Sequence, residues 1–163
     1  MPSTDPAPGT DPEIDDDRKL AGYAETLIDG LNLHVPAWVE RTLTDRLQRP
    51  FDLDASPATA AAVTTALAAV GELLRTDVDA QVANPLAIIR SLVPSMTAVL
   101  VDGGVPAVGR DPDAEWLFPD DHYDLTPGNF SDLHPDLHLP GLTWGAAKAH
   151  VHLQRRRTES EQR

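Results

Sequence analysis

Cysteine is absent from this chain of 163 residues, and several classes of site are excluded with it. Without cysteine there are no disulfides, no thiolate nucleophile and no zinc site built on sulfur ligands. The first residues are acidic and proline-rich, so they lack the basic and apolar regions of a secretory signal peptide. The most apolar run, 86–101, contains Arg90 and Pro94 and is shorter than the roughly 18 apolar residues of a membrane span. We therefore expect a cytoplasmic protein with no membrane contact.

The motifs of familiar enzyme families are missing too. The sequence contains no G-x-S-x-G nucleophile elbow, no H-E-x-x-H zinc motif and no calcium-loop spacing of the EF-hand type. The glycine-containing stretch 103–109 has no lysine, serine or threonine where a phosphate-binding P-loop needs one. These absences favour a role other than catalysis.

The net charge of −13 is distributed unevenly along the chain. Residues 1–17 contribute −6 and residues 102–138 contribute −8, whereas 18–101 carry only −2 and 139–163 carry +3. Binding to nucleic-acid phosphates needs clustered lysine and arginine, so no nucleic-acid partner is expected. An acidic surface instead favours a basic partner, cations or simple solubility.

Residues 57–83 hold the longest helical pattern, and we expect the rest of the chain to be organised around it. Ser56 can cap this helix with its hydroxyl, and Pro57 suits the first helical position. The larger apolar residues recur in steps of three and four at Val63, Leu67, Val70, Leu74, Val78 and Val82. The pair Asn84-Pro85 ends the helix, because a residue before proline avoids the α region.

Four further helices are predicted from apolar periodicity and from start and stop signals. They span 18–31, 36–48, 85–101 and 142–156. Pro94 removes one backbone hydrogen bond inside the third of them and should kink or split it.

The fold class predicted from these elements is all-α: a bundle of four to five helices around the long central helix, with a proline-rich strap and a C-terminal helix. A single helical domain is expected to span 18–157. Residues 1–17 are expected to form a disordered acidic tail, because they cannot bury enough apolar surface to offset the entropy of ordering. Residues 158–163 are expected to be a frayed C-terminus.

The strap, residues 102–140, is rich in proline, glycine and aspartate and leaves no room for a helix of more than two turns. Aromatic side chains are concentrated in it or just after it, at Trp116, Phe118, Tyr123, Phe130 and Trp144. Such a concentration argues against disorder. We therefore expect an ordered segment that lies across the helical body.

Acidic and aromatic residues together make the strap a candidate partner surface, because loops held on a rigid body commonly carry binding residues. The residues expected to contact a basic protein are Trp116, Phe118, Asp120, Asp121, His122 and Tyr123. The alternative is that these aromatics only anchor the strap to the bundle.

A second candidate site is the run Asp132-Leu-His134-Pro-Asp136-Leu-His138. His134 and His138 are four residues apart, which would place both on one face of a helix. With Asp132 and Asp136 they could hold a divalent metal, although the neighbouring prolines limit any helix to about one turn. The alternative is that the histidines cap turns or pair with aspartates. By default we therefore expect that the protein has no cofactor.

A third possible role, besides partner binding and metal binding, is that the bundle carries an apolar ligand between its helices.

The run from Trp116 to Pro127, together with Trp144 to Ala149, is similar to an uncharacterised family of small actinobacterial proteins. The resemblance covers roughly the C-terminal half and implies no activity, cofactor or catalytic residue. From the charge and the aromatic residues of the strap, we expect a non-enzymatic, cytoplasmic protein-interaction or regulatory module that uses this acidic, aromatic segment. Metal binding or metal-dependent catalysis by the histidine and aspartate cluster is the alternative.

Overall fold

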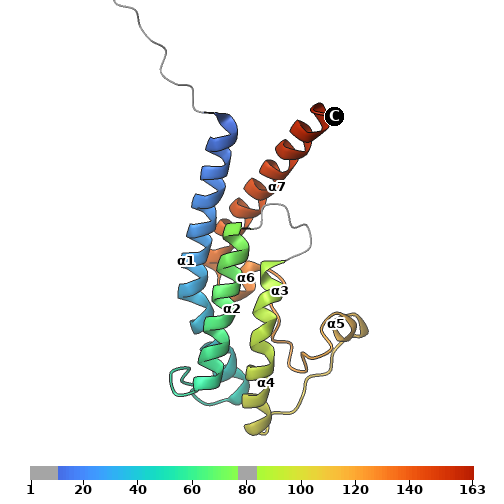
Figure 1. The fold of residues 1–163 in the computed structure, drawn as a ribbon. Coiled ribbons are helices and arrows are strands. Elements are labelled where there is room, and N and C mark those ends of the chain that lie inside the picture. The colour runs from blue at the N-terminus through green and yellow to red at the C-terminus, as the bar shows by residue number, and fades with distance from the viewer. Residues whose placement is uncertain (1–10, 77–83) are drawn as a thin grey trace, which may run out of the picture.

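The computed structural model of the chain describes residues 11–76 and 84–163. These residues form an all-α fold in which no strand is present, as predicted (Figure 1). The elements in chain order are α1 (Pro12–Leu47), α2 (Pro57–Thr76), α3 (Pro85–Ile89), the 3-10 helix η1 (Arg90–Leu92), α4 (Val93–Asp102), α5 (Pro112–Leu117), α6 (Phe130–Leu133), the 3-10 helix η2 (Pro135–Leu137) and α7 (His138–Glu161).

The first helix, α1, is the longest of these elements and is continuous over 36 residues. The predicted break before Pro36 is therefore wrong. Pro36 cannot donate a hydrogen bond to the carbonyl of Asn32, but Asn32 is exposed, so water can satisfy that carbonyl. Val35 and Val39 are completely buried beside it, and this packing carries the helix through the proline.

The helix α1 also begins earlier than predicted, because acidic residues assigned to the tail form its first turns. Asp11 caps it by accepting a hydrogen bond from the backbone N–H of Glu13 at 3.1 Å. Asp15 pairs with Lys19 at 2.6 Å, one turn further along the helix. Negative charge at a helix N-terminus complements the helix dipole. The remainder of the predicted tail, 1–10, lies outside the described residues.

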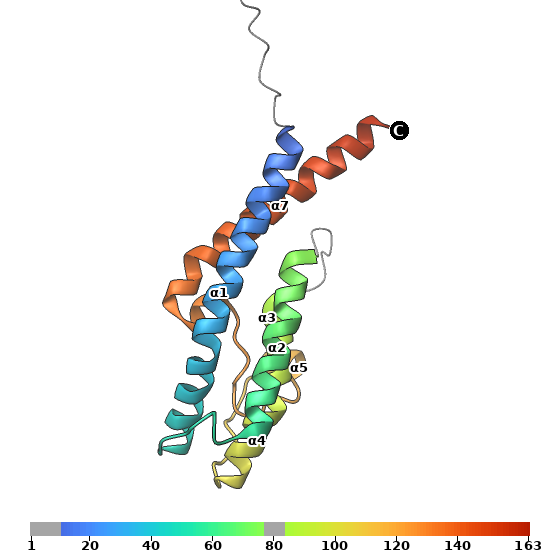
Figure 2. The same cartoon turned by 60° about the vertical axis from the view of Figure 1, so that its left-hand side comes forward.

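Among the described elements, the contact between α7 and α1 is the most extensive. The helix α7 starts four residues before the predicted helix and ends five residues after it. Figure 2 shows α1 and α7 crossing, with the N-terminal end of α1 and the C-terminal end of α7 extending beyond α2. Polar contacts join these ends: Asp16 lies 3.2 Å from Nε2 of His150, and Asp17 forms an ion pair with Arg155 at 3.3 Å.

The predicted central helix corresponds to α2, which lies between α1 and the α3–α4 segment. It begins at Pro57 as predicted. The hydroxyl of Ser56, expected to cap the helix by accepting from a backbone N–H, instead donates to the hydroxyl of Thr59 at 3.2 Å. The predicted apolar stripe is buried at Val63, Val70 and Leu74. Residues 77–83, with the predicted stripe positions Val78 and Val82, lie outside the described part of the chain.

The predicted helix 85–101 is interrupted next to Pro94, as predicted. The one turn of 3-10 helix, η1, ends directly before α4, whose second residue is Pro94. Pro94 cannot bond to the carbonyl of Arg90, so the α-helical ladder stops there. The pieces still share one buried stripe, which fills the centre of the core with Ile89, Leu92, Met96 and Leu100.

Two helical segments, Pro57–Thr76 and Pro85–Asp102, are long and apolar enough to cross a membrane by length and composition alone. In the fold they pack against each other and against α1. Several of their larger apolar residues, among them Val70, Ile89 and Leu100, are buried in the core of the bundle, whereas Val101 is 59% exposed.

The strap is held against the bundle by close packing at a glycine of α7. A Cβ on Gly141 would lie 2.3 Å from the ring of Phe130, so only glycine admits this aromatic side chain. Gly30 of α1 likewise leaves room for Leu137, because a Cβ on Gly30 would lie 2.7 Å from the side chain of Leu137. These two contacts explain how the C-terminal part of the strap lies so close to α1 and α7.

Candidate functional site

The helix α5 carries the most exposed aromatic residue that the structure describes. The side chain of Trp116 is 81% exposed, that of Leu117 is 53% exposed, and no residue of α5 is buried. Figure 1 shows α5 standing away from the packed helices. Large apolar side chains on an isolated turn of helix are therefore presented to solvent rather than used in the core.

This exposed helix is nevertheless firmly built. The side chain of Asp111 caps it by accepting a hydrogen bond from the backbone N–H of Ala114 at 2.8 Å. Arg110 donates to the carbonyls of Ala114 and Asp121, which ties the helix to the segment that follows it. Sequence reasoning missed this role of Arg110, the only lysine or arginine between residues 102 and 138.

Acidic side chains surround the exposed apolar pair. Asp113 and Glu115 lie on α5 itself and are exposed. Asp120 is exposed too but already pairs with Arg90 at 3.3 Å. The guanidinium of Arg90 also lies 5.8 Å from the ring centre of Phe118, a cation–π contact that half-buries this aromatic. The surface around α5 therefore retains an excess of negative charge.

Asp121 faces the interior instead of the surface, being only 2% exposed. Its carboxylate accepts hydrogen bonds from the backbone N–H groups of Leu125 at 2.8 Å, Thr126 at 2.7 Å and Tyr123 at 3.4 Å. Burial alone would raise the pKa of Asp121, but these N–H groups stabilise the charged form and hold the pKa below its ordinary value of 3.8. Asp121 thus organises the turn and cannot meet a partner in this conformation.

Tyr123 is likewise an anchor, with 3% of its side chain exposed. Its hydroxyl donates to the carbonyl of Val105 at 2.9 Å, which closes the loop that contains α5. Of the six residues predicted to contact a partner, Asp121 and Tyr123 are therefore buried and are not part of an exposed contact surface.

Asp120 and His122 lie beside a shallow hollow of about 570 Å³ on the outer side of α4. Its helical wall is formed by Pro94, Thr97, Ala98 and Val101. Val101 is 59% exposed, so an apolar floor is available between two polar edges. The hollow adjoins the loop that carries α5, because Asp120 and His122 of that loop line it.

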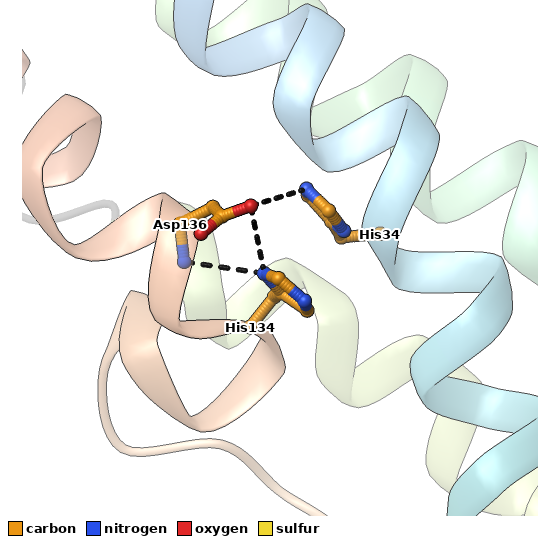
Figure 3. Close-up of side chains that lie close together, drawn as sticks. All are labelled: His34, His134 and Asp136. Carbon is orange, nitrogen blue, oxygen red and sulfur yellow. Dashed lines mark hydrogen bonds and ion pairs between the residues drawn. The ribbon is translucent and has the colours of Figure 1, made fainter.

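The predicted metal cluster is brought together only in part (Figure 3). His134 and Asp136 are adjacent, and the third member is His34 of α1, with possible ligand atoms all within 4.8 Å of one another. His34 is separated from His134 by 100 residues, so no local spacing could have indicated it. Asp132 is occupied elsewhere, because it accepts hydrogen bonds from Gly128 at 2.8 Å and from Asn129 at 3.1 Å.

The fourth predicted ligand, His138, is exposed at the start of α7 and does not belong to this group. The carboxylate of Asp136 lies 3.9 Å from Nε2 of His34 and 3.5 Å from Nδ1 of His134. A tetrahedral zinc ion with bonds of about 2.0–2.1 Å holds its ligand atoms roughly 3.3–3.5 Å apart. The distance between Asp136 and His134 is therefore close to that of a zinc site, whereas the three donor atoms together are held only within 4.8 Å of one another.

The orientation of the two rings is less favourable for a metal than their spacing. The imidazoles of His34 and His134 are stacked, with ring centres 3.8 Å apart and planes 9° from parallel. A metal must lie near the plane of each ring that binds it, so one ring would have to turn. Nδ1 of His134 also accepts a hydrogen bond from the backbone N–H of Asp136 at 3.1 Å, which caps η2.

No protein-family model matches this sequence, and no curated protein or solved structure matches it either. The resemblance to a family of small actinobacterial proteins therefore stays a prediction.

Proposed function

We propose that this chain is a non-enzymatic, cytoplasmic protein-interaction module that presents Trp116 and Leu117 to a basic protein partner. The observation that carries the proposal is the 81% exposure of Trp116 on a helix that is capped, clamped and without a buried residue. A residue exposed by chance at a loose loop tip would need neither the Asp111 cap nor the Arg110 clamp.

The energetics favour such an arrangement. Tryptophan is among the residues most often found to dominate binding energy at interfaces. Burying an exposed leucine contributes roughly 1.5–3 kcal/mol, and the larger tryptophan offers more apolar area. Because α5 is already folded, its binding would carry little of the entropy loss that ordering a flexible segment requires.

The charge around α5 favours a basic partner. Asp113 and Glu115 flank the apolar pair, so a basic rim around an apolar pocket is the complementary surface. We expect binding to weaken as salt is raised from low to physiological concentration, because exposed charges are screened over about 8–10 Å.

The test is affinity capture with the full chain, followed by identification of the retained proteins. Trp116→Ala should remove the specific partners, and Glu115→Lys should weaken their capture and reduce its salt dependence. Leu33→Ala is the matched control, because Leu33 is 69% exposed on α1, outside the strap. Retention of every partner by both α5 variants would refute the proposal.

A second candidate function is binding of a divalent transition metal, favoured by the approach of His34 to His134 and Asp136. Turning one imidazole would let both rings and the carboxylate serve as ligands, with water in the remaining position. Calorimetric titration of the protein with zinc tests this idea. His34→Ala should abolish binding, whereas His138→Ala should leave it unchanged; equal affinities for both variants, or no binding at all, would exclude the site.

A further inference from the structure

The helix α7 has two apolar faces, and the bundle uses only one. The inner face packs on α1 and the strap through the buried residues Gly141, Trp144 and Val151. The outer face carries a second stripe in which every residue is exposed: Leu139, Leu142, Ala146, Ala149 and Leu153. Its three leucines are 70%, 58% and 55% exposed.

The spacing of this outer stripe is regular. Its residues follow one another at intervals of three, four, three and four, which is the repeat of a coiled-coil seam. Single exposed leucines are common on soluble proteins. Five consecutive seam positions over about 20 Å of helix are a continuous apolar strip instead.

The order of large and small residues makes the strip complementary to itself when two copies run antiparallel. In antiparallel pairing Ala146 meets Ala149 of the second copy, and Leu142 meets its Leu153. Two small central layers are then flanked by a leucine layer on each side. Alanines at the centre also allow the two helix axes to approach closely.

The charges select the same orientation. Parallel pairing would set Arg156, the next seam position, against Arg156 of the second copy. Antiparallel pairing instead brings the exposed Arg156 to the other end of the strip, where Asp136 is exposed. Its long side chain can cover Leu139 of the other copy and extend its guanidinium toward Asp136, whose side chain is 74% exposed beside His34 and His134.

We propose that this chain forms a two-fold symmetric dimer through antiparallel pairing of the outer faces of α7. The seam is shorter than the three to four heptads of a self-sufficient coiled coil. However, α7 is already held as a helix by α1, so pairing does not have to fold it. The dimer is independent of α5, and its partner is a second copy of the same chain.

Sedimentation velocity of the full chain over a wide range of concentration measures the association. Ala146→Arg places one positive charge from each copy near the two-fold axis. The two charges repel each other, so the dissociation constant should rise by more than about tenfold. Ala21→Arg is the matched control, because Ala21 is also an exposed alanine and lies on α1, and this variant should not change the dissociation constant. A wild-type chain that is monomeric throughout, or a dimer that survives Ala146→Arg in a folded protein, would overturn the proposal.

The orientation can be mapped by disulfide formation, because the natural chain has no cysteine. Under mild oxidation, a mixture of the Leu142→Cys and Leu153→Cys proteins should give a cross-linked heterodimer, whereas each protein alone should not cross-link efficiently. Self-linking of each single variant, as in a parallel pair, would overturn the antiparallel assignment. Loss of association on Trp116→Ala would instead assign the interface to α5 and refute the α7 dimer.

Discussion

The two halves of the strap have similar composition and opposite roles. The presenting half, 106–120, contains no buried residue, although it includes Trp116 and Phe118. The anchored half, 121–137, buries Tyr123, Leu125, Leu133 and Leu137 together with the carboxylate of Asp121. Both halves are rich in proline, aspartate and aromatic residues.

The halves differ in which side chain forms hydrogen bonds with their backbone polar groups, and in whether that side chain lies inside or at the surface. In the anchored half the Asp121 carboxylate collects the N–H groups of a turn, so the following apolar residues can enter the core. In the presenting half, Arg110 satisfies carbonyls on the surface side and α5 remains outside. The comparison shows that aromatic content alone does not tell an anchor from a contact surface.

The largest difference between the halves should appear when a leucine is truncated in each. Leu125 is 2% exposed, so Leu125→Ala should lower the free energy of unfolding by about 2–5 kcal/mol. Leu117→Ala should change it by less than about 0.5 kcal/mol, because Leu117 is already in solvent. Urea denaturation followed by circular dichroism measures both; similar losses would contradict the division of the strap.

The Asp121→Asn variant should lose about 1–3 kcal/mol at neutral pH, because the amide cannot accept all the N–H groups that the carboxylate satisfies. The pKa of Asp121 is lower in the folded chain than its ordinary value of 3.8. Its stabilising contribution is therefore complete above that value and is lost as the pH falls through the folded pKa. Denaturation profiles at acidic pH should converge for the wild type and the variant, and a constant difference would refute this assignment.

The packing of the anchored half on α7 is tested by a pair of glycines. Gly141→Ala places a Cβ against the ring of Phe130 and should cost about 1–3 kcal/mol. Gly145→Ala meets no atom within 4 Å and should stabilise α7 by about 0.5–1 kcal/mol. Thermal unfolding of the two variants should shift in opposite directions; a shift in the same direction would show that Phe130 can move aside.

The smallest effect on stability is expected for Trp116, the centre of the presenting half. Trp116→Phe should change the free energy of unfolding by less than about 0.5 kcal/mol. It should nevertheless remove most of the tryptophan fluorescence that acrylamide quenches, because Trp38 and Trp144 are only 8% and 6% exposed. Unchanged quenching would mean that Trp116 is covered in solution.

Local chemistry alone predicted much of this protein. Backbone rules set the start of α2 at Pro57, the start of α3 at Pro85 and the interruption before Pro94, because proline limits the chain in any context. The same rules and the apolar periodicity led to an all-α fold with an irregular strap. They also placed Trp116 among the candidate contact residues, but they did not separate it from the buried Tyr123.

Only the tertiary structure decided the features that depend on distant partners. Packing carried α1 through Pro36, and the crossing of α1 and η2 brought His34 to His134 and Asp136. The same packing turned Asp121 inward and left one apolar face of α7 outside. Periodicity and start signals act over one or two turns of chain, whereas these contacts join segments up to 100 residues apart. The sequence alone therefore could not decide which strap residues are buried or which apolar face of α7 is covered.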